Sequence, residues 1–148
     1  MSKILSFIFL VLVTPLLPSF FFFIGIKLGY IDHYGIVEYF NVIFVDKISW
    51  ILYWVIGIVF ALLFMSPYKR LGGALFIIVV LLSMSMLSSS FAHRVGSSMF
   101  SKNPFYIKVI PWTYKGILLY EGRDDYYLLN DENSRTMTFK KEEVDEAY

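Results

Sequence analysis

The chain has 148 residues, of which 57% are hydrophobic and 20% aromatic, and it carries a net charge of +1 and no cysteine. Soluble domains are about 45–50% apolar, so this excess favours a membrane protein. Without cysteine, the chain cannot form disulfides, thiolate nucleophiles or cysteine-based zinc sites. A net charge this small gives no long-range attraction to nucleic acid, and we expect no nucleic-acid partner.

Three long apolar stretches occupy the first 92 residues: Ile4–Ile26, Ile48–Met65 and Leu71–Ala92. At about 1.5 Å per residue, the second spans about 27 Å and the third about 33 Å, against a hydrocarbon core of about 30 Å. They predict three transmembrane helices. Pro15 and Pro18 each remove a backbone donor, so we expect the first helix to be kinked there.

The second and third stretches are joined by five residues, Ser66–Arg70, which predict a tight antiparallel hairpin. Aromatic residues at spacings of three and four open the second stretch and share one helix face, where their amphipathic rings favour the membrane–water interface. The turn carries two basic residues, which stay in water. The expected interface anchors are Trp50, Tyr53, Trp54, Lys69 and Arg70.

Small residues recur on the apolar stretches at positions that allow helices to approach closely. Three small-xxx-small pairs occur, and two neighbouring glycines open the third stretch. The expected helix-packing residues are Gly25 and Gly29, Gly57 and Ala61, Ser85 and Ser89, and Gly72 and Gly73.

Residues 1–94 form the predicted transmembrane domain, with residues 27–47 as an interfacial loop. Three spans place this loop and the carboxyl-terminal tail on one side of the bilayer, and the amino terminus and the hairpin turn on the other. Basic residues mark both sides, so the positive-inside rule leaves the orientation open. Lys3 near the amino terminus favours that end inside and the tail outside, in a bacterial inner membrane.

The tail predicts a small β domain over residues 105–148, after a polar hinge at residues 95–104. Short segments rich in aromatic and β-branched residues, separated by turn residues, predict an antiparallel meander of three or four strands. The segments are Phe105–Ile110, Gly116–Tyr120, Tyr126–Asn130 and Arg135–Phe139, with a turn at residues 130–134 and one helical turn expected within Lys140–Tyr148. So small a domain, with no disulfide or metal, needs a surface to lean on: the membrane, the first loop, a second copy or another protein.

A group of ionisable residues is expected on the tail side of the membrane: Asp32, His33, Glu38, Asp46 and His93. Imidazoles and carboxylates can bind zinc or iron. These residues lack the paired spacing of a metal-binding helix, so ordinary interfacial polar residues are the favoured interpretation, and we predict no metal, cofactor or catalytic residue. The helix interiors hold no ionisable residue, which argues against proton relays and charge-coupled transport.

These observations favour a non-enzymatic membrane protein that acts through protein contacts. It would be an accessory or assembly subunit, or an immunity-type protein that protects against a membrane-active toxin. Aromatic residues with a neighbouring arginine are typical of interface anchors. The expected partner-binding residues are Trp112, Tyr114, Tyr120, Arg123, Tyr126 and Tyr127.

Two alternatives stay open. The first is a homo-oligomeric channel or transport component, with Ser83, Ser85, Ser89 and Ser90 toward a shared axis. The second is a membrane enzyme with an interfacial site made from Asp32, His33, Glu38 and His93.

Overall fold

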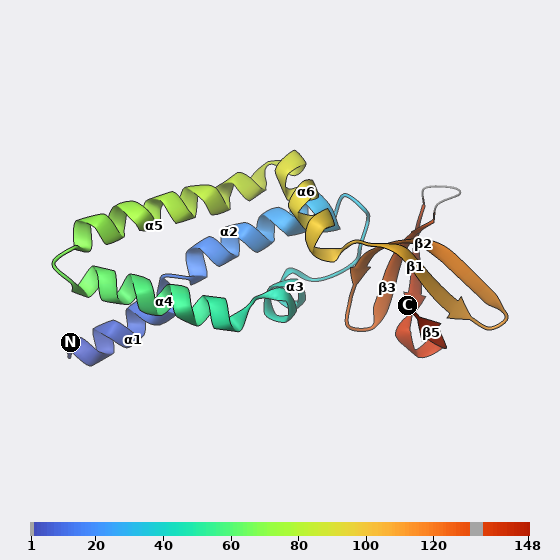
Figure 1. The fold of residues 1–148 in the computed structure, drawn as a ribbon, viewed down its shortest axis with the longest axis horizontal. Coiled ribbons are helices and arrows are strands. Elements are labelled where there is room, and N and C mark those ends of the chain that lie inside the picture. Colours follow the sequence, from blue (N-terminus) through green and yellow to red (C-terminus); the bar gives the residue numbers. More distant parts are fainter. Residues whose placement is uncertain (1, 131–134) are drawn as a thin grey trace.

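Helices form one end of the elongated molecule, and a β-sheet forms the other (Figure 1). This computed structural model describes residues 2–130 and 135–148, so most of the predicted turn at residues 130–134 lies outside the described residues. The helical elements are α1 (Lys3–Val13), α2 (Leu16–Ile26), a π-helical turn η1 (Lys27–Ile31), α3 (Phe40–Lys47), α4 (Trp50–Met65), α5 (Lys69–Met84), a 3₁₀ turn η2 (Ser85–Leu87) and α6 (Ser89–Phe100).

Two helices in the described residues are long and apolar enough to cross a membrane. They are Lys3–Ile31, with 29 residues, and Lys69–Leu87, with 19 residues. The α3–α4 pair, bent by 81°, counts as a third if both helices belong to one span. This arrangement is compatible with membrane insertion.

The α-helical structure of the first apolar stretch is interrupted between Val13 and Leu16. Pro15 has no N–H and cannot donate to the carbonyl of Val11. Gly57 of α4 lies against that carbonyl, since a Cβ added to the glycine would stand 2.2 Å from the Val11 oxygen. Beside it, the Tyr53 hydroxyl donates to the Leu12 carbonyl at 2.5 Å. The second apolar stretch therefore packs tightly on the end of α1.

The third apolar stretch differs from the prediction of one helix over residues 71–92. Helix α5 ends at Met84, η2 follows, and α6 begins at Ser89 in a new direction (Figure 1). Serine hydroxyls compete with the helix for backbone partners. Ser83 donates to the Val79 carbonyl at 2.9 Å and Ser85 to the Leu82 carbonyl at 2.6 Å, just before the break.

Helix α6 extends to Phe100 and so occupies much of the predicted hinge at residues 95–104. Small residues bring it close to η1. A Cβ on Gly29 would stand 2.5 Å from the Ala92 Cβ, and one on Gly96 would stand 2.4 Å from Cγ of Tyr30. Close packing on η1 explains why these residues form a helix rather than a flexible link.

The described part of the tail forms a five-stranded antiparallel sheet with the order β4-β3-β2-β1-β5. Its strands are β1 (Lys102–Val109), β2 (Trp112–Glu121), β3 (Asp125–Asn130), β4 (Thr136–Lys140) and β5 (Glu146–Ala147). The prediction of three or four strands missed β5, which pairs with the outer edge of β1. A 3₁₀ turn, Lys141–Glu143, lies where one helical turn was predicted.

Two clusters of buried residues pack against the sheet, one on each of its faces. The larger cluster joins Leu119, Tyr120 and Tyr127 of the sheet to helix and loop residues that include Tyr30 and Ile36. The smaller cluster lies within the tail and consists of Phe105, Ile107, Leu118 and Leu128. One face of the sheet is therefore continuous with the core of the helical end.

The packing at Gly57 predicts a stability difference between two helical glycines. We expect Gly57→Ala to lower the free energy of unfolding by about 1–3 kcal/mol, because its methyl group overlaps the Val11 backbone. A Cβ added to Gly73 of α5 would meet no other element of the described chain within 4 Å, so Gly73→Ala should gain about 0.5–1 kcal/mol from helix propensity. Denaturant titration in detergent measures both, and equal effects would contradict the close α1–α4 contact.

Candidate functional site

The sheet rests on the first loop and η1 through side-chain hydrogen bonds to backbone carbonyls. The bonds run from Tyr30 Oη to Leu119 O (2.9 Å), from Tyr127 Oη to Val37 O (3.3 Å) and from Thr136 Oγ1 to Tyr34 O (3.0 Å). The first loop thus supplies the surface that so small a sheet needs.

Helix α3 holds the sheet through charged groups. Both Arg123 guanidinium contacts to the Asp46 carboxylate measure 2.6 Å, in the bidentate geometry that makes such pairs strong. The Lys47 ammonium donates to the Glu121 carbonyl at 3.0 Å and lies 5.0 Å from the ring centroid of Tyr120. Two neighbouring residues at the end of α3 therefore bind the β2–β3 turn and the end of β2.

Most of the residues predicted to bind a partner lie in contacts within the chain. Tyr120 is 1% exposed and Tyr127 is 3% exposed, both in the cluster between sheet and helices. Arg123 is bound to Asp46. The remaining aromatic residues pack inside the tail: Tyr126 lies under Lys141, and the Tyr114 ring centroid is 4.9 Å from that of Phe139.

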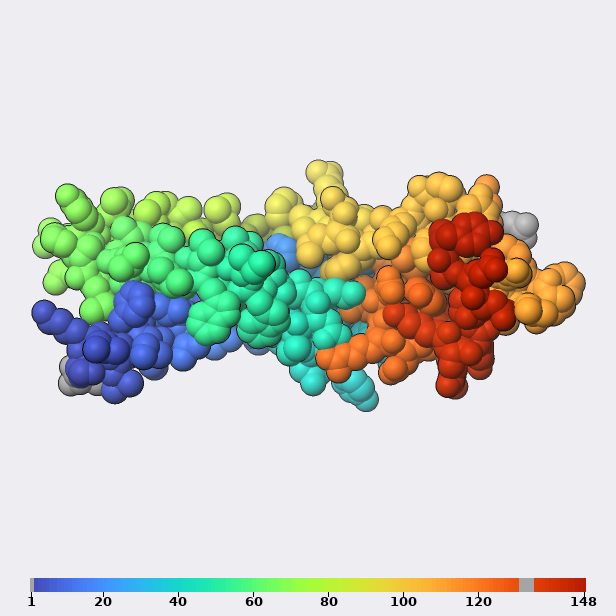
Figure 2. Space-filling view, turned by 60° about the horizontal axis from the view of Figure 1, so that its bottom comes forward, coloured from blue at the N-terminus to red at the C-terminus, as the bar shows by residue number. Residues whose placement is uncertain are grey.

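Trp112 differs from these residues because it projects into solvent. It is 67% exposed, and Ile110 is 69% exposed. Ile110 and Pro111 form the turn between β1 and β2, and together with Trp112, the first residue of β2, they make up what we call the hairpin tip. The tip lies at the end of the molecule opposite the α4–α5 turn (Figures 1 and 2). The Ile110 N–H donates to the Asp145 carboxylate at 3.0 Å, so the tip is anchored to the tail behind it.

The ionisable residues predicted on the tail side of the membrane do not form one group. The first group lies beside α6: the His33 and His93 rings meet edge to face, 5.2 Å between centroids, and the Tyr34 hydroxyl lies 2.9 Å from Nε2 of His93. Asp32 pairs with Lys27. The second group is separate from these residues and consists of two carboxylates, Glu38 and Asp46, which lie against the β2–β3 turn.

No group of three or more His, Asp or Glu side chains in the described ranges is placed to hold a metal ion. The four residues of the alternative enzyme site do not converge, because Glu38 lies against Gly122 of the β2–β3 turn, whereas His33 lies beside His93 of α6. This geometry gives that alternative no assembled site among the residues that the structure describes.

The contact between loop and sheet perturbs the titration of groups within it. Desolvation is the main cause that raises the pKa of the Glu38 carboxyl, and the negative charges of nearby aspartates raise it further. A hydrogen bond from the Arg123 backbone lowers this pKa but does not cancel the rise. Burial likewise raises the pKa of the Tyr120 and Tyr127 hydroxyls. Desolvation in this contact therefore favours the neutral forms of Glu38, Tyr120 and Tyr127, whereas the hydrogen-bonded pair with Arg123 lowers the pKa of Asp46 and favours its charged form.

The serines predicted to line a channel do not lie on one helix face. Ser83 and Ser85 bond to carbonyls of α5, whereas Ser89 and Ser90 belong to α6, beside His33 and His93.

The predicted interface anchors differ in their exposure. Trp50, Trp54, Lys69 and Arg70 are exposed, whereas the buried Tyr53 bonds to α1.

Several residues that build this contact were missed from the sequence, among them Tyr30, Lys47 and Thr136. Each lies far along the chain from its partner, so no local pattern marks it.

Comparison of the chain with protein-family models, curated proteins and solved structures gives no match. A functional assignment therefore has to come from the geometry of the chain itself.

Removing the Tyr30 hydroxyl should loosen the sheet. In Tyr30→Phe, the buried Leu119 carbonyl loses its side-chain donor, which costs about 1–3 kcal/mol. We expect faster hydrogen exchange at the β2 amides and faster proteolytic release of the tail. Tyr148→Phe, at an exposed ring, is the control. Unchanged exchange in Tyr30→Phe would show that the hydroxyl does not hold the sheet.

The raised pKa of Glu38 predicts a pH dependence with a definite sign. Because its folded pKa lies above the ordinary value of 4.5, its contribution to stability is present at lower pH and is lost as pH rises through the folded pKa. Glu38→Gln should therefore raise the melting temperature relative to wild type at neutral pH, with a difference that shrinks toward pH 4.5. Glu142→Gln, at an exposed carboxylate, is the control and should show no such trend.

Proposed function

We propose that this chain is an integral membrane protein with three spans that acts without catalysis, by contact with another protein. Its role would be that of an accessory or assembly subunit, or of an immunity-type protein that blocks a membrane-active toxin. The spans are Lys3–Ile31, the bent α3–α4 pair and Lys69–Leu87. Their alternation brings the first loop and the sheet to one side, which we assign to the outside of a bacterial inner membrane on the basis of Lys3.

The hairpin tip carries this proposal. Turns favour glycine, proline, asparagine, aspartate and serine. Pro111 fits this preference, whereas the apolar Ile110 beside it does not. Here Ile110 and Trp112 flank Pro111, and all three side chains are exposed. Three consecutive exposed apolar residues are unfavourable in water unless a partner covers them.

The position of the tip decides which kind of partner fits. The helices at the opposite end of the molecule would lie in the bilayer, so the tip would project away from it and the lipids could not cover its side chains (Figure 1). A protein with an apolar pocket can bury the Trp112 ring, and tryptophan is among the residues most often found at the centre of protein interfaces. The buried Tyr120 and Tyr127 hold the sheet in place and leave the tip to make the contact.

The test is purification of the tagged chain from native membranes, with identification and quantification of co-eluting proteins. A stoichiometric partner should be retained by wild type and lost at least about tenfold in Trp112→Ser, because interface hot spots contribute about 2 kcal/mol or more. Tyr39→Ser, at an exposed aromatic residue near the base of the extramembrane region, is the matched control. Retention of the partner by Trp112→Ser contradicts the proposed contact, and a homo-oligomer with no partner would favour the channel alternative.

A further inference from the structure

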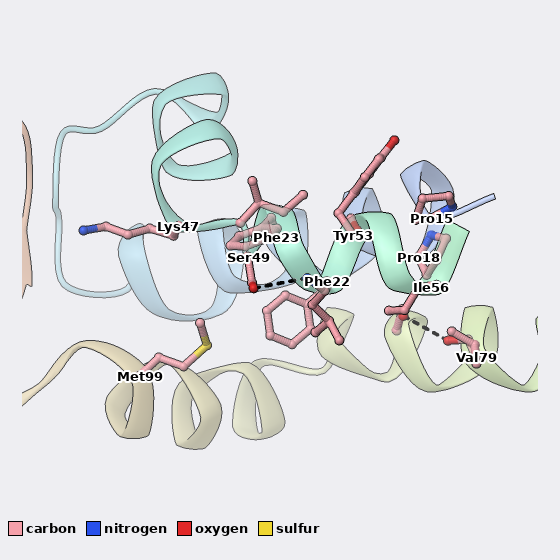
Figure 3. Close-up of a pocket in the computed structure, with 14 residues that line it drawn as sticks. Pro15, Pro18, Phe22, Phe23, Lys47, Ser49, Tyr53, Ile56, Val79 and Met99 are labelled. Atoms are coloured by element: carbon pink, nitrogen blue, oxygen red, sulfur yellow. Dashed lines mark hydrogen bonds between the residues drawn. The ribbon is translucent and has the colours of Figure 1, made fainter. Parts of the chain in front are cut away.

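An apolar slot opens between α2, α4, α5 and α6 and has a volume of about 300 Å³ (Figure 3). Its wall includes Phe22 and Phe23 of α2, Ile56 of α4, Val79 of α5 and Met99 of α6. We call this cavity the membrane slot. Figure 3 shows the Phe22 ring in the space between the helices, with Lys47 extending away at one end and Ile56 and Val79 at the other.

The slot exists because the first apolar stretch changes its packing partner at the prolines. Helix α1 packs on α4, with Gly57 against Val11, whereas α2 packs on α5 and η2. Gly25 makes the second contact close, since a Cβ there would stand 2.3 Å from the Met86 carbonyl oxygen. The first half of α4 is thereby separated from α2, and Pro15 and Pro18 line the resulting gap.

The chemistry of the wall favours a hydrocarbon chain. The polar side chains at the slot are largely engaged with the protein: Ser83 donates to the Val79 carbonyl at 2.9 Å, and Ser49 accepts from the Leu52 N–H at 3.4 Å. Aromatic and branched aliphatic side chains supply most of the remaining surface. From Ser49 to Ile56, the helix rises about 10 Å, so the slot follows α4 from its beginning toward its middle.

A polar hollow of about 360 Å³ adjoins the slot at the end nearest the sheet and shares Lys47 and Met99 with it. Both carboxylates of this hollow are bound to cations of the tail. Asp46 pairs with Arg123 at 2.6 Å, and Glu121 pairs with Lys141 at 3.0 Å.

The hollow's two lysines, Lys47 and Lys102, form no ion pair with a carboxylate in the described part of the chain. Lys47 donates one N–H to the Glu121 carbonyl at 3.0 Å, which leaves its ammonium group two further donors. Positive charge therefore lies beside the mouth of an apolar slot, at the depth where the helices meet the extramembrane sheet. An apolar compartment next to a cationic one matches an amphiphile with a hydrocarbon tail and an anionic head.

We propose that the slot and the hollow together bind one anionic phospholipid from the leaflet on the sheet side. One acyl chain enters sideways from the bilayer and lies along α4 in the membrane slot, and the headgroup phosphate lies near Lys47 and Lys102. The lipid would fill the gap between α2 and α4 and touch the base of the sheet. This inference rests on the slot and not on the hairpin tip, so it stands independently of the proposed protein contact.

The test places the full chain in nanodiscs of phosphatidylglycerol that carries a photoactivatable diazirine in its acyl chain. Cross-links should concentrate in residues 47–56 and 79–83, and native mass spectrometry should find one retained lipid per chain. Ser83→Phe fills the slot and should abolish both signals. Leu82→Phe, on a neighbouring side chain that is 65% exposed and does not line the slot, should preserve them.

A second pair of variants tests the headgroup contact. Lys102→Gln should lower the retention of phosphatidylglycerol relative to phosphatidylcholine about fivefold, the change expected for one lysine near an anionic lipid surface. Lys115→Gln, at an exposed lysine of β2 outside the hollow, should leave that ratio unchanged. Wild-type labelling spread evenly over the lipid-facing helices would overturn the proposal whether or not any variant folds, and so would full lipid retention by a folded Ser83→Phe.

Discussion

The fold depends on one buried side chain, Tyr30, at the junction between helices and sheet. Its ring packs against Gly96 of α6 and lies 5.9 Å from the Phe100 ring, centroid to centroid, while its hydroxyl donates to Leu119 of the sheet. No part of the residue is exposed to solvent. Leaving a buried hydroxyl without a partner is costly, so this bond adds to apolar packing in fixing the position of the strand relative to η1.

The small sheet is stabilised by a hydrophobic core that it shares with the helices. A tail of this size, without cysteine, has too little apolar surface of its own to fold with a wide margin. Its own cluster of Phe105, Ile107, Leu118 and Leu128 is therefore supplemented on the opposite face by the cluster that reaches into the helices. The Arg123–Asp46 pair and the Lys47 bond orient the sheet on α3, so the sheet cannot turn freely on its support.

This firm attachment separates the surfaces of the molecule by role. Aromatic residues near the β2–β3 turn are buried and pack the sheet against the helices and first loop, whereas the hairpin tip at the far end is exposed. At the helical end, the exchange of packing partners at Pro15 separates α2 from α4 and leaves the membrane slot. The proposed protein contact and the proposed lipid site therefore lie on opposite sides of the junction between helices and sheet.

The sequence by itself determined the broad composition of this protein: apolar helices first, and then an antiparallel sheet. These features follow from local properties, namely the length of apolar runs and the aromatic, β-branched segments between turn residues. Local pattern was a poorer guide to boundaries, as the break at Ser88 shows, because α6 follows its packing on η1 rather than the hydropathy of the stretch. The tertiary structure alone decided that Tyr120 and Tyr127 are buried, that Trp112 is exposed, and that Glu38 lies apart from His33 and His93. The exposure of a side chain depends on which distant segments meet around it, and here the decisive bond joins residues 89 positions apart.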